Sequence, residues 1–222
     1  MYNSAEHMND ARALRLKIAQ VGELVLRQRA RPLTPEQIKS REIQELIENM
    51  RTTMYDAPGV GLAAPQIGAS LQLAVIEDKP EYTKDSPSEF LKERERRPVP
   101  FHVIVNPLII EAGGAVPEFF EGCLSLAAFT AVVPRAREVV VKCLDHKGNP
   151  KTIEATGWYA RILQHEIDHL RGLIYIDRMR AGSFMSMENF NRHWKDKPMQ
   201  EVRRVLDIEE KRLSITSVSN GP

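Results

Sequence analysis

The sequence lacks the features that define several large classes of protein. It contains only two cysteines, Cys123 and Cys143, too few for a disulfide framework, which indicates a reducing compartment. Its 31 basic and 30 acidic residues leave a net charge of +1, so neither sign is in excess to attract DNA or an acidic membrane surface. No apolar run approaches the roughly 18 residues of a membrane-spanning helix. We therefore expect no DNA partner and no membrane partner.

The N-terminus also lacks the apolar core of a secretory signal peptide, because residues 1–10 are polar and include Glu6 and Asp10. The next stretch, residues 12–31, is rich in arginine, as some organelle-targeting segments are. It also carries apolar residues at helical spacing, and we predict a helix there. These apolar residues are Leu14, Ile18, Val21 and Leu24.

What the chain does have is the composition of a globular protein, with 42% hydrophobic and 27% charged residues. Its length allows a sizeable core. We expect a single domain over residues 1–181 and a C-terminal extension over residues 182–222, helical with a loose end after residue 213. One face of the helix predicted in this extension consists of Met199, Val202, Leu206 and Leu213.

Helices are predicted on both sides of a central region of strands. Thr34, Pro35 and Gln37 form a capping-box pattern, and apolar residues at helical spacing continue to Met54 before the helix ends at residues 57–59. Residues with strand propensity follow in five segments. The predicted strands are residues 71–76, 103–110 (broken at Asn106 and Pro107), 131–133, 138–144 and 151–155.

Three connecting segments complete this pattern. Residues 145–149 are predicted to join the last two strands as a hairpin, and residues 111–114 to form a turn. Residues 77–100 are rich in charge and proline, which predicts a solvated excursion or a short exposed helix. The order of elements indicates an α+β fold with mainly antiparallel sheets rather than alternating β-α-β units.

The most informative stretch is residues 164–169, which read QHEIDH. His165 and His169 lie four residues apart, so on a helix both imidazoles lie on one face and can bind one metal ion. Glu166 is placed to act on a water at that ion. The surrounding apolar residues and Gly172 as a C-terminal stop predict a buried helix. The alternative is a surface helix in which the histidines occur by chance.

A third metal ligand is needed, and the sequence offers several positions for it. Downstream, Tyr175 occupies the ligand position of one class of metalloprotease, and Glu188 is a candidate of the kind used by another class. Upstream, Cys123 can supply a thiolate, whereas Cys143 is interpreted as a small buried residue. The glycine-rich stretch 59–68 predicts a tight loop and lacks the lysine of a phosphate-binding loop.

Three of these stretches together resemble a known family. Residues 59–66 (GVGLAAPQ), 121–125 (EGCLS) and 164–169 (QHEIDH) resemble the three signature motifs of peptide deformylases, in the right order. The resemblance covers residues 16–179 and is closer to the group that includes organellar type 1A-like members. It implies an α+β fold with mainly antiparallel sheets packed around a central metal-binding helix, an N-terminal helix and a C-terminal helical tail.

The resemblance also implies a chemistry. Cys123, His165 and His169 would bind one divalent ion, Fe2+ in most of the family, with Zn2+, Ni2+ or Co2+ as substitutes. The implied reaction is hydrolysis of the N-formyl group from the initiator methionine of nascent polypeptides, which releases formate. Glu166 would accept a proton from water and pass it to the leaving amine. Gln66 and the backbone N–H of Leu124 would donate hydrogen bonds to the oxyanion.

Substrate contacts follow from the same resemblance. Gly61 would let the peptide backbone pair in strand fashion. The methionine side chain would enter an apolar pocket, for which Val60, Trp158 and Ile162 are the candidates. We expect Asp168 to form a structural ion pair with Arg135. Many bacterial members carry an arginine seven residues after the ligand cysteine, whereas this chain has Thr130.

The implied partners are N-formylmethionyl nascent peptides and, transiently, the ribosome, which basic residues of the C-terminal extension would touch. The implied compartment is the bacterial cytoplasm, with an organellar matrix or stroma as the alternative. Two other functions remain open. One is a zinc metalloprotease that uses the same helix motif. The other is a metal-stabilised binding module without catalytic activity.

Overall fold

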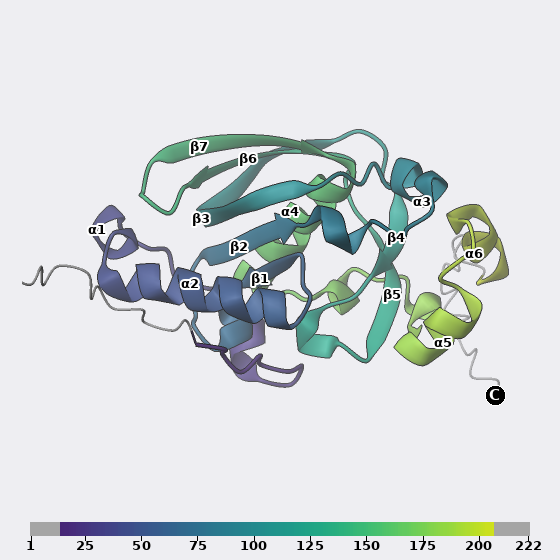
Figure 1. Cartoon of the computed structure of the whole chain (residues 1–222), viewed down its shortest axis with the longest axis horizontal. Helices are drawn as coiled ribbons and strands as arrows, with labels where there is room; N and C mark the ends of the chain where they lie inside the picture. Colours follow the sequence, from purple (N-terminus) through teal and green to yellow (C-terminus); the bar gives the residue numbers. More distant parts are fainter. Residues whose placement is uncertain (1–13, 207–222) are drawn as a thin grey trace, which may run out of the picture.

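The computed structural model describes residues 14–206 and has an α+β fold. Every pair of neighbouring strands in its two sheets is antiparallel. The larger sheet has the order β1-β2-β3-β6-β7 (Figure 1), and the smaller one has the order β4-β5-β8. The strands are β1 (Gly61–Ala63), β2 (Leu73–Asp78), β3 (Val99–Gly113), β4 (Glu118–Glu121), β5 (Phe129–Pro134), β6 (Glu138–Leu144), β7 (Pro150–Thr156) and β8 (Met185–Ser186).

Six α-helices accompany these strands within residues 14–206. They are α1 (Pro35–Ile38), α2 (Arg41–Asp56), α3 (Ser88–Glu93), α4 (Gly157–Leu170), α5 (Met187–His193) and α6 (Met199–Val205). None of the helices in this part of the chain combines the length and the apolar character that crossing a bilayer requires. The helix predicted around residues 164–169 is α4, and Gly172 lies just beyond its end at φ +78°.

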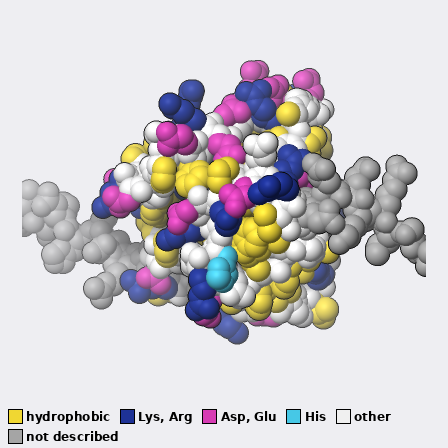
Figure 2. Space-filling view, turned by 90° about the vertical axis from the view of Figure 1, so that its right-hand side faces the viewer, with side chains coloured by type: hydrophobic (Ala, Val, Ile, Leu, Met, Phe, Trp, Pro, Cys, Tyr) yellow, Lys and Arg dark blue, Asp and Glu magenta, His cyan; other side chains and the backbone are white. Residues whose placement is uncertain are grey.

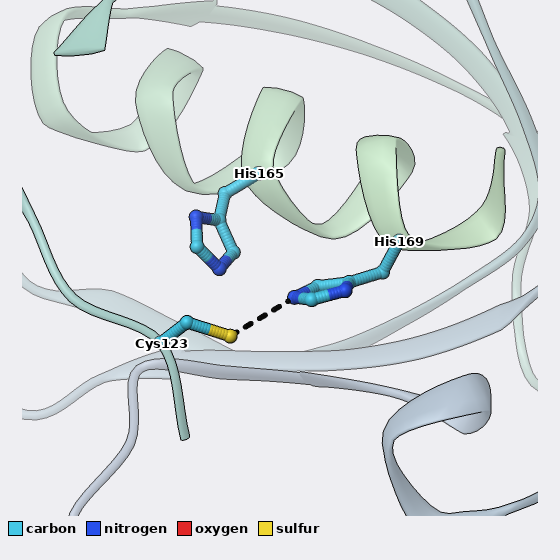
Figure 3. Close-up of side chains that lie close together, drawn as sticks. All are labelled: Cys123, His165 and His169. Carbon is cyan, nitrogen blue, oxygen red and sulfur yellow. Dashed lines mark hydrogen bonds between the residues drawn. The ribbon is translucent and has the colours of Figure 1, made fainter. Parts of the chain in front are cut away.

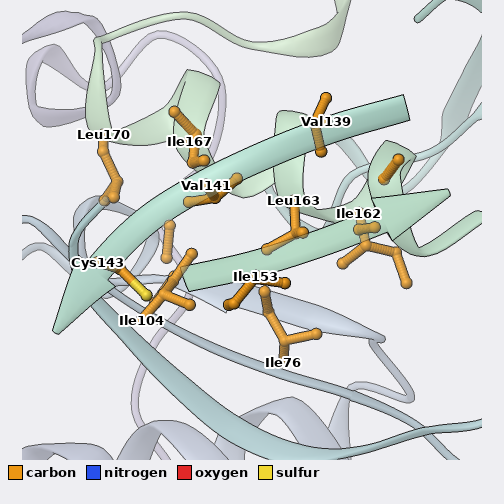
Figure 4. Close-up of a cluster of buried hydrophobic side chains, with 14 of the residues drawn as sticks. Ile76, Ile104, Val139, Val141, Cys143, Ile153, Ile162, Leu163, Ile167 and Leu170 are labelled. Carbon is orange, nitrogen blue, oxygen red and sulfur yellow. The ribbon is translucent and has the colours of Figure 1, made fainter. Parts of the chain in front are cut away.

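Helix α4 lies between the two sheets and has two different faces. Leu163, Ile167 and Leu170 are buried against one face of the larger sheet, together with Val139 and Val141 of β6 (Figure 4). Burial of each such side chain stabilises the fold by roughly 1.5–3 kcal/mol. The opposite face of α4 carries polar side chains toward the β4–β5 hairpin. The helix is therefore anchored by apolar packing on one side and presents ionisable groups on the other.

The capping box at Thr34 is confirmed, but the helix it begins is short. The Thr34 side chain accepts from the N–H of Gln37, and the Gln37 side chain accepts from the N–H of Thr34. Helix α1 ends at Ile38, and Ser40 caps a second helix, α2. The single helix predicted from Thr34 to residue 57 is thus two helices. Helix α2 packs on the other face of β1 and β2 through a second apolar cluster.

The helix predicted within residues 12–31 is wrong for the part that the structure describes. That part is extended or in turns, apart from the short 3-10 helix η1 (Leu24–Arg27), and Leu14, Val21 and Leu24 are exposed. The backbone instead bonds to distant segments, because the N–H of Ala19 donates to Gln66 O (2.7 Å) and that of Val21 to Ser125 O (2.9 Å). Tertiary hydrogen bonds replace the helical ones that the apolar spacing suggested.

The predicted strands are confirmed as elements, with differences at their ends. Strand β3 runs without interruption through Asn106 and Pro107 and through most of the predicted turn 111–114. Asn106 has φ +49°, and the register of β3 against β6 shifts at this point. The Asn106 side chain accepts from the N–H of Leu33 (2.9 Å) and donates to the carbonyl of Leu33 (2.8 Å). Pairing with β6 extends β3 as far as Gly113. Strands β1 and β4 lie in segments that periodicity did not identify as strands.

The charged segment 77–100 is only partly solvated. It contains the predicted short helix, α3, but Asp78 is buried and Arg94 and Arg96 are half-buried against the body of the protein. The prediction that this segment is a solvated excursion is therefore wrong at its two ends. At one end, the guanidinium groups of Arg94 and Arg96 lie over the ring of Trp158, and at the other, Asp78 is paired with Arg96.

The described part of residues 182–206 contains the helices α5 and α6, and strand β8, which pairs with β5, precedes them. Met199 and Val202 of α6 are buried against Phe119 and Phe120 of β4, while Leu206 lies at the edge of this cluster. Leu213 and the loose end predicted for residues 214–222 lie outside the described residues. The division into a domain over residues 1–181 and an extension over residues 182–222 stays a prediction.

Candidate active site

Three potential metal ligands meet between α4 and the chain that follows β4. His165 and His169 lie one turn apart on α4, and Cys123 lies two residues after the end of β4 (Figure 3). One ligand atom from each residue lies within 4.8 Å of the others, and Cys123 Sγ is 3.3 Å from His169 Nε2. The structure thus brings Cys123 next to two histidines that follow it by more than 40 residues in the sequence.

Buried charges fix the orientation of this group. Glu121 accepts from His165 Nδ1 (3.1 Å), which leaves Nε2 of that ring to face Cys123. Glu121 is itself held by Arg135 through two hydrogen bonds of 3.0 Å and by Arg161 through one of 2.7 Å. Burial disfavours the charged carboxylate, but Arg135 and His165 outweigh this and hold the pKa of Glu121 well below its usual range. A charged Glu121 therefore holds the ring of His165 through Nδ1, the nitrogen that does not face Cys123.

Cys123 is electrostatically prepared to be a thiolate. Burial alone would raise the pKa of its thiol, but the neighbouring His169 and His165 outweigh burial and lower the pKa well below its ordinary value. Cys143 has the opposite character, because burial in the apolar core raises the pKa of its thiol to about 11. Its interpretation as a small buried residue is thereby confirmed.

The residues fit a divalent transition-metal ion. One thiolate and two imidazoles form the mixed sulfur and nitrogen donor set that suits iron, zinc, cobalt or nickel. Beside these donors, the buried Oε2 atom of Glu166 has no hydrogen-bond partner within residues 14–206. A buried polar group without a partner is costly. The donor chemistry and this unpartnered atom together indicate a site built for an additional group.

Glu166, which is also on α4, lies beside the three potential ligands. Burial raises the pKa of its carboxyl group, and the carboxylate lies directly against β1. A Cβ atom placed on Gly61 would be 2.6 Å from Cδ of Glu166, so only glycine leaves the carboxylate its present position. The glycine-rich stretch therefore makes the close backbone approach that its composition predicted.

Gln66 faces the same centre from the short 3-10 helix η2 (Ala64–Ile67). Its Oε1 accepts from the N–H of Ala63 (2.9 Å), which fixes the amide with Nε2 toward Cys123 Sγ (3.4 Å). Nε2 also donates to Ser125 Oγ (3.3 Å). Leu124 follows Cys123 as the first residue of the 3-10 helix η4 (Leu124–Leu126), so its N–H has no partner inside that helix. Ser125 is a contact that the sequence did not identify.

A cavity of about 660 Å³ opens beside these residues. Its lining includes every residue that the sequence assigned to substrate binding: Val60, Gly61, Trp158 and Ile162. Cys123, His165, Glu166 and Gln66 face the same space. Arg96, Arg161 and Met187 also line it and were not predicted. Arg96 and Met187 reach the cavity from distant segments, which no local pattern marks, whereas Arg161 is the neighbour of Ile162 on α4.

The remaining candidates have structural contacts. Asp168 pairs with Arg135, as predicted, and also with Arg178 through bonds of 2.6 and 2.7 Å. Thr130 donates from Oγ1 to the carbonyl of Glu121 (2.8 Å) and so supports the same strand. The two downstream alternatives for the third ligand differ in position. Tyr175 is buried in an apolar cluster with Cys123, Ala131 and Val133, and its hydroxyl has no hydrogen-bond partner within residues 14–206.

Glu188 is the other downstream candidate for a third ligand. It is an exposed residue of α5 that pairs with Arg192 at 2.9 Å. In the part of the chain that the structure describes, the group able to hold a metal contains Cys123 and does not contain Glu188. This arrangement favours Cys123, upstream of the helix, over Glu188 as the third donor.

Comparisons with known proteins agree with this geometry. A sequence model of the family described as polypeptide deformylase matches residues 15–184. The chloroplastic peptide deformylase 1A of Solanum lycopersicum is 45% identical over 174 residues, which are 78% of this chain and 63% of that protein. The chloroplastic/mitochondrial peptide deformylase 1A of Arabidopsis thaliana is 45% identical over 175 residues, 79% of this chain and 65% of that protein.

Bacterial proteins are similar as well. Peptide deformylase 1 of Bifidobacterium longum is 42% identical over 184 residues, which cover 83% of this chain and 82% of that protein. Among solved structures, a class I type b peptide deformylase from Acinetobacter baumannii with bound Met-Ala-Ser has a TM-score of 0.67 at 31% identity. That similarity covers 75% of this chain and 99% of the other. The chain spans less than two thirds of the length of the two plant relatives, at 63% and 65%.

Proposed function

This chain belongs to the peptide deformylase family, and we propose that it hydrolyses the N-formyl group from the initiator methionine of nascent polypeptides and releases formate. The single observation that carries the proposal is the meeting of Cys123 with His165 and His169 beside a buried glutamate. A protease that uses the helix motif alone would leave Cys123 and Gln66 without roles. Both side chains face the centre, which favours the deformylase.

Cys123, His165 and His169 would hold the metal ion, which we propose to be Fe2+, with Zn2+, Ni2+ or Co2+ as substitutes. When bound there, the ion would supply Lewis acidity toward the formyl oxygen and toward water. Glu121 supports the site by fixing the ring of His165, and Arg135 and Arg161 keep Glu121 charged and in place.

Glu166 is proposed as the group that moves protons. Its carboxylate would take a proton from the attacking water as the oxygen adds to the formyl carbon. It would return that proton to the leaving nitrogen as the C–N bond breaks, so the products are formate and a free amine. The Glu166 side chain lines the cavity, and its Oε2 atom has no hydrogen-bond partner within residues 14–206, so we propose this atom as the acceptor for the water.

Gln66 and the backbone N–H of Leu124 are proposed to donate to the oxyanion that forms on the formyl oxygen. The Gln66 amide is held by Ala63 and Ser125, so its donor is oriented before the substrate binds. Each such donor can contribute about 3 kcal/mol to stabilisation of the transition state.

The peptide would bind as an added strand. Strand β1, which contains Gly61, is at the edge of the larger sheet, so one side of its backbone is available for pairing. Val60, Trp158 and Ile162 line the adjoining cavity and would surround the methionine side chain. Affinity would then come from main-chain bonds and from one apolar pocket, so that many different nascent chains can be accepted.

Replacement of Gln66 by leucine should lower kcat for formate release about 100-fold, because a donor worth about 3 kcal/mol in the transition state is removed. KM should change little. Steady-state kinetics on a formyl-methionyl tripeptide, with metal analysis of the same preparation, measures both effects. Replacement of Ser125 by alanine is the comparison, since it keeps the Gln66 amide. An unchanged kcat in the leucine variant with full metal content would contradict the assignment.

Replacement of Gly61 by alanine should lower turnover about 100-fold, because the new Cβ would displace the Glu166 carboxylate from its position by the order of an ångström. Replacement of Gly113 by alanine is the matched control, since a Cβ there meets nothing within 4 Å. Turnover of both variants is compared with that of the original protein. Normal activity of the Gly61 variant would show that this close approach is not required for catalysis.

The function itself is tested by an anaerobic assay for formate release from a formyl-methionyl peptide, together with metal analysis. Formate and the free amino terminus should appear in equal amounts. Cleavage of internal peptide bonds in unformylated peptides, without formate release, would instead support the metalloprotease.

Contact with the ribosome and the compartment remain proposals. The ribosome contact would involve basic residues of the extension, of which Lys211 and Arg212 lie outside the described residues. Of the described ones, Arg203 already pairs with Glu118 at 3.1 Å. Figure 2 shows basic and acidic side chains mixed on the side of the molecule that carries α5 and α6. We place the protein in a bacterial cytoplasm, with an organellar matrix or stroma as the alternative, since its relatives include bacterial and chloroplastic proteins.

A further inference from the structure

The segment of Arg94, Glu95 and Arg96 lies directly against the first turn of α4. Gly157, the first residue of α4, has φ +57°, and a Cβ atom there would lie 3.1 Å from the carbonyl oxygen of Arg94 and would overlap the side chain of Glu95. This close backbone approach places the segment beside Trp158, the next residue of the helix. A stretch that is remote in sequence thereby forms part of the wall of the catalytic cavity.

Two bidentate ion pairs hold this segment, and they differ in position. Arg96 donates from Nε and from Nη2 to the two carboxylate oxygens of Asp78, each at 2.8 Å, and Asp78 is only 1% exposed. Glu95 accepts two bonds from Arg137, at 2.6 and 3.0 Å, and that pair is at the surface. Of these four residues, Arg96 is the one that lines the cavity.

The indole ring of Trp158 packs against the apolar core and lies beneath two arginines. The guanidinium carbon of Arg96 is 5.0 Å from the ring centroid, and that of Arg94 is 5.9 Å from it. Both distances allow attraction between the cation and the aromatic face. The indole Nε1 is buried and has no hydrogen-bond partner within residues 14–206. In that range, therefore, the indole N–H makes no hydrogen bond that would orient the ring, and of the two arginines over it the guanidinium of Arg96 is the nearer.

We propose that Arg96, anchored by Asp78, is a positioning residue that holds Trp158 as a wall of the methionine pocket and thereby sets selectivity for the first side chain of the substrate. This inference rests on the deformylase function proposed above. The hydrogen bonds of the Arg96 side chain within the described part of the chain go to Asp78, not to Glu166 or to the three metal ligands. Arg96 therefore acts on binding of the side chain and not on the chemical step.

Replacement of Arg96 by leucine tests this positioning role. KM for a formyl-methionyl peptide should rise about tenfold, and the preference for formyl-methionyl over formyl-alanyl peptides, measured as the ratio of kcat/KM, should fall about tenfold. The kcat for the methionyl peptide and the metal content should stay within about twofold. Arg137→Leu is the matched control, because it removes the other bidentate pair of the same segment and leaves the cavity lining intact.

Since the leucine variant leaves Asp78 as a buried charge without a partner, Arg96→Lys is made as well. Lysine keeps a cation near Asp78 but lacks the planar guanidinium group with its two parallel donors. The preference for formyl-methionyl over formyl-alanyl peptides should therefore fall in this variant too, by a smaller factor. The exposure of the ring is measured independently of turnover, by acrylamide quenching of Trp158 fluorescence. Because the chain has two tryptophans, this is done in a Trp194→Phe background. Quenching should increase in both Arg96 variants and not in Arg137→Leu.

A double-variant cycle decides whether Arg96 acts through the ring. In a Trp158→Leu background, Arg96→Leu should cause no further loss of selectivity. Unchanged selectivity and quenching in both single variants, or a full effect of Arg96→Leu in the absence of Trp158, would overturn the inference. Absence of formate release from the original protein would refute the proposed function, and the selectivity claim with it. The quenching data would still show separately whether Arg96 holds the ring.

Discussion

Replacement of Glu166 by glutamine is expected to reduce kcat for formate release about 1000-fold, while the protein stays folded and keeps its metal. Glutamine has nearly the same shape as glutamate but cannot accept and return a proton. Because Oε2 of Glu166 has no hydrogen-bond partner in residues 14–206, the amide group that replaces it breaks no bond at that atom. The loss should therefore lie in the chemical step and not in folding.

The measurement is single-turnover and steady-state kinetics on a formyl-methionyl peptide, with metal content and thermal unfolding of the same sample. Glu154→Gln is the matched control, because it makes the same chemical change at an exposed position of β7. Removal of a group that acts only in the transition state lowers kcat and kcat/KM together. Turnover equal to that of the original protein in the Glu166 variant would overturn the assignment of this residue as the proton carrier.

Replacement of Cys123 by alanine should have the second large effect, which is loss of bound metal and of essentially all turnover. The thiolate is one of three donors, and histidines 165 and 169 alone leave the ion with too few protein ligands for a stable catalytic site. Cys123 is also the donor whose pKa the site lowers, so the structure favours its charged, ligating form. Metal content by atomic absorption and formate release are the two readouts.

Cys143→Ala is the matched control for this experiment. Cys143 is the other buried cysteine, its thiol has a pKa raised to about 11, and it lies in the apolar core between α4 and the larger sheet. Its replacement should leave metal content and turnover near those of the original protein. If Cys123→Ala kept its full metal content, the third donor would have to be another residue, and the assignment of the family's ligand set to this chain would fail.

Elements defined by short-range patterns could be predicted from the sequence. The spacing of His165 and His169 placed both imidazoles on one face of a helix, and α4 has that arrangement. The capping box at Thr34 and the hairpin that joins β6 to β7 are also local, and both are present. In each case the hydrogen bonds or the packing face that define the element involve residues only a few positions apart, so the sequence contains the whole pattern.

Elements whose partners are distant in sequence were the ones predicted incompletely. The apolar spacing in residues 14–24 suggested a helix, yet the backbone there bonds to residues 66 and 125. Strand β3 continues to Gly113 because β6 is present to pair with it. Residues 94–96 were expected to be solvated, but Asp78 and Trp158 provide a buried anion and an aromatic face that draw Arg96 inward. Tertiary partners outweigh local propensity in all three cases.

The active site divides in the same way. The sequence by itself determined two imidazoles and a carboxylate on one buried helix, because the period of the α-helix fixes their relation to one another. Local spacing left the third ligand open among positions 123, 175 and 188, and the resemblance of three motifs to one family favoured Cys123. Only the tertiary structure places Cys123 beside both histidines, since antiparallel pairing of β4 with β5 and the buried charges of Arg135 and Glu121 bring the sulfur to them. Contacts across more than 40 residues depend on how whole elements pack, which no local period encodes.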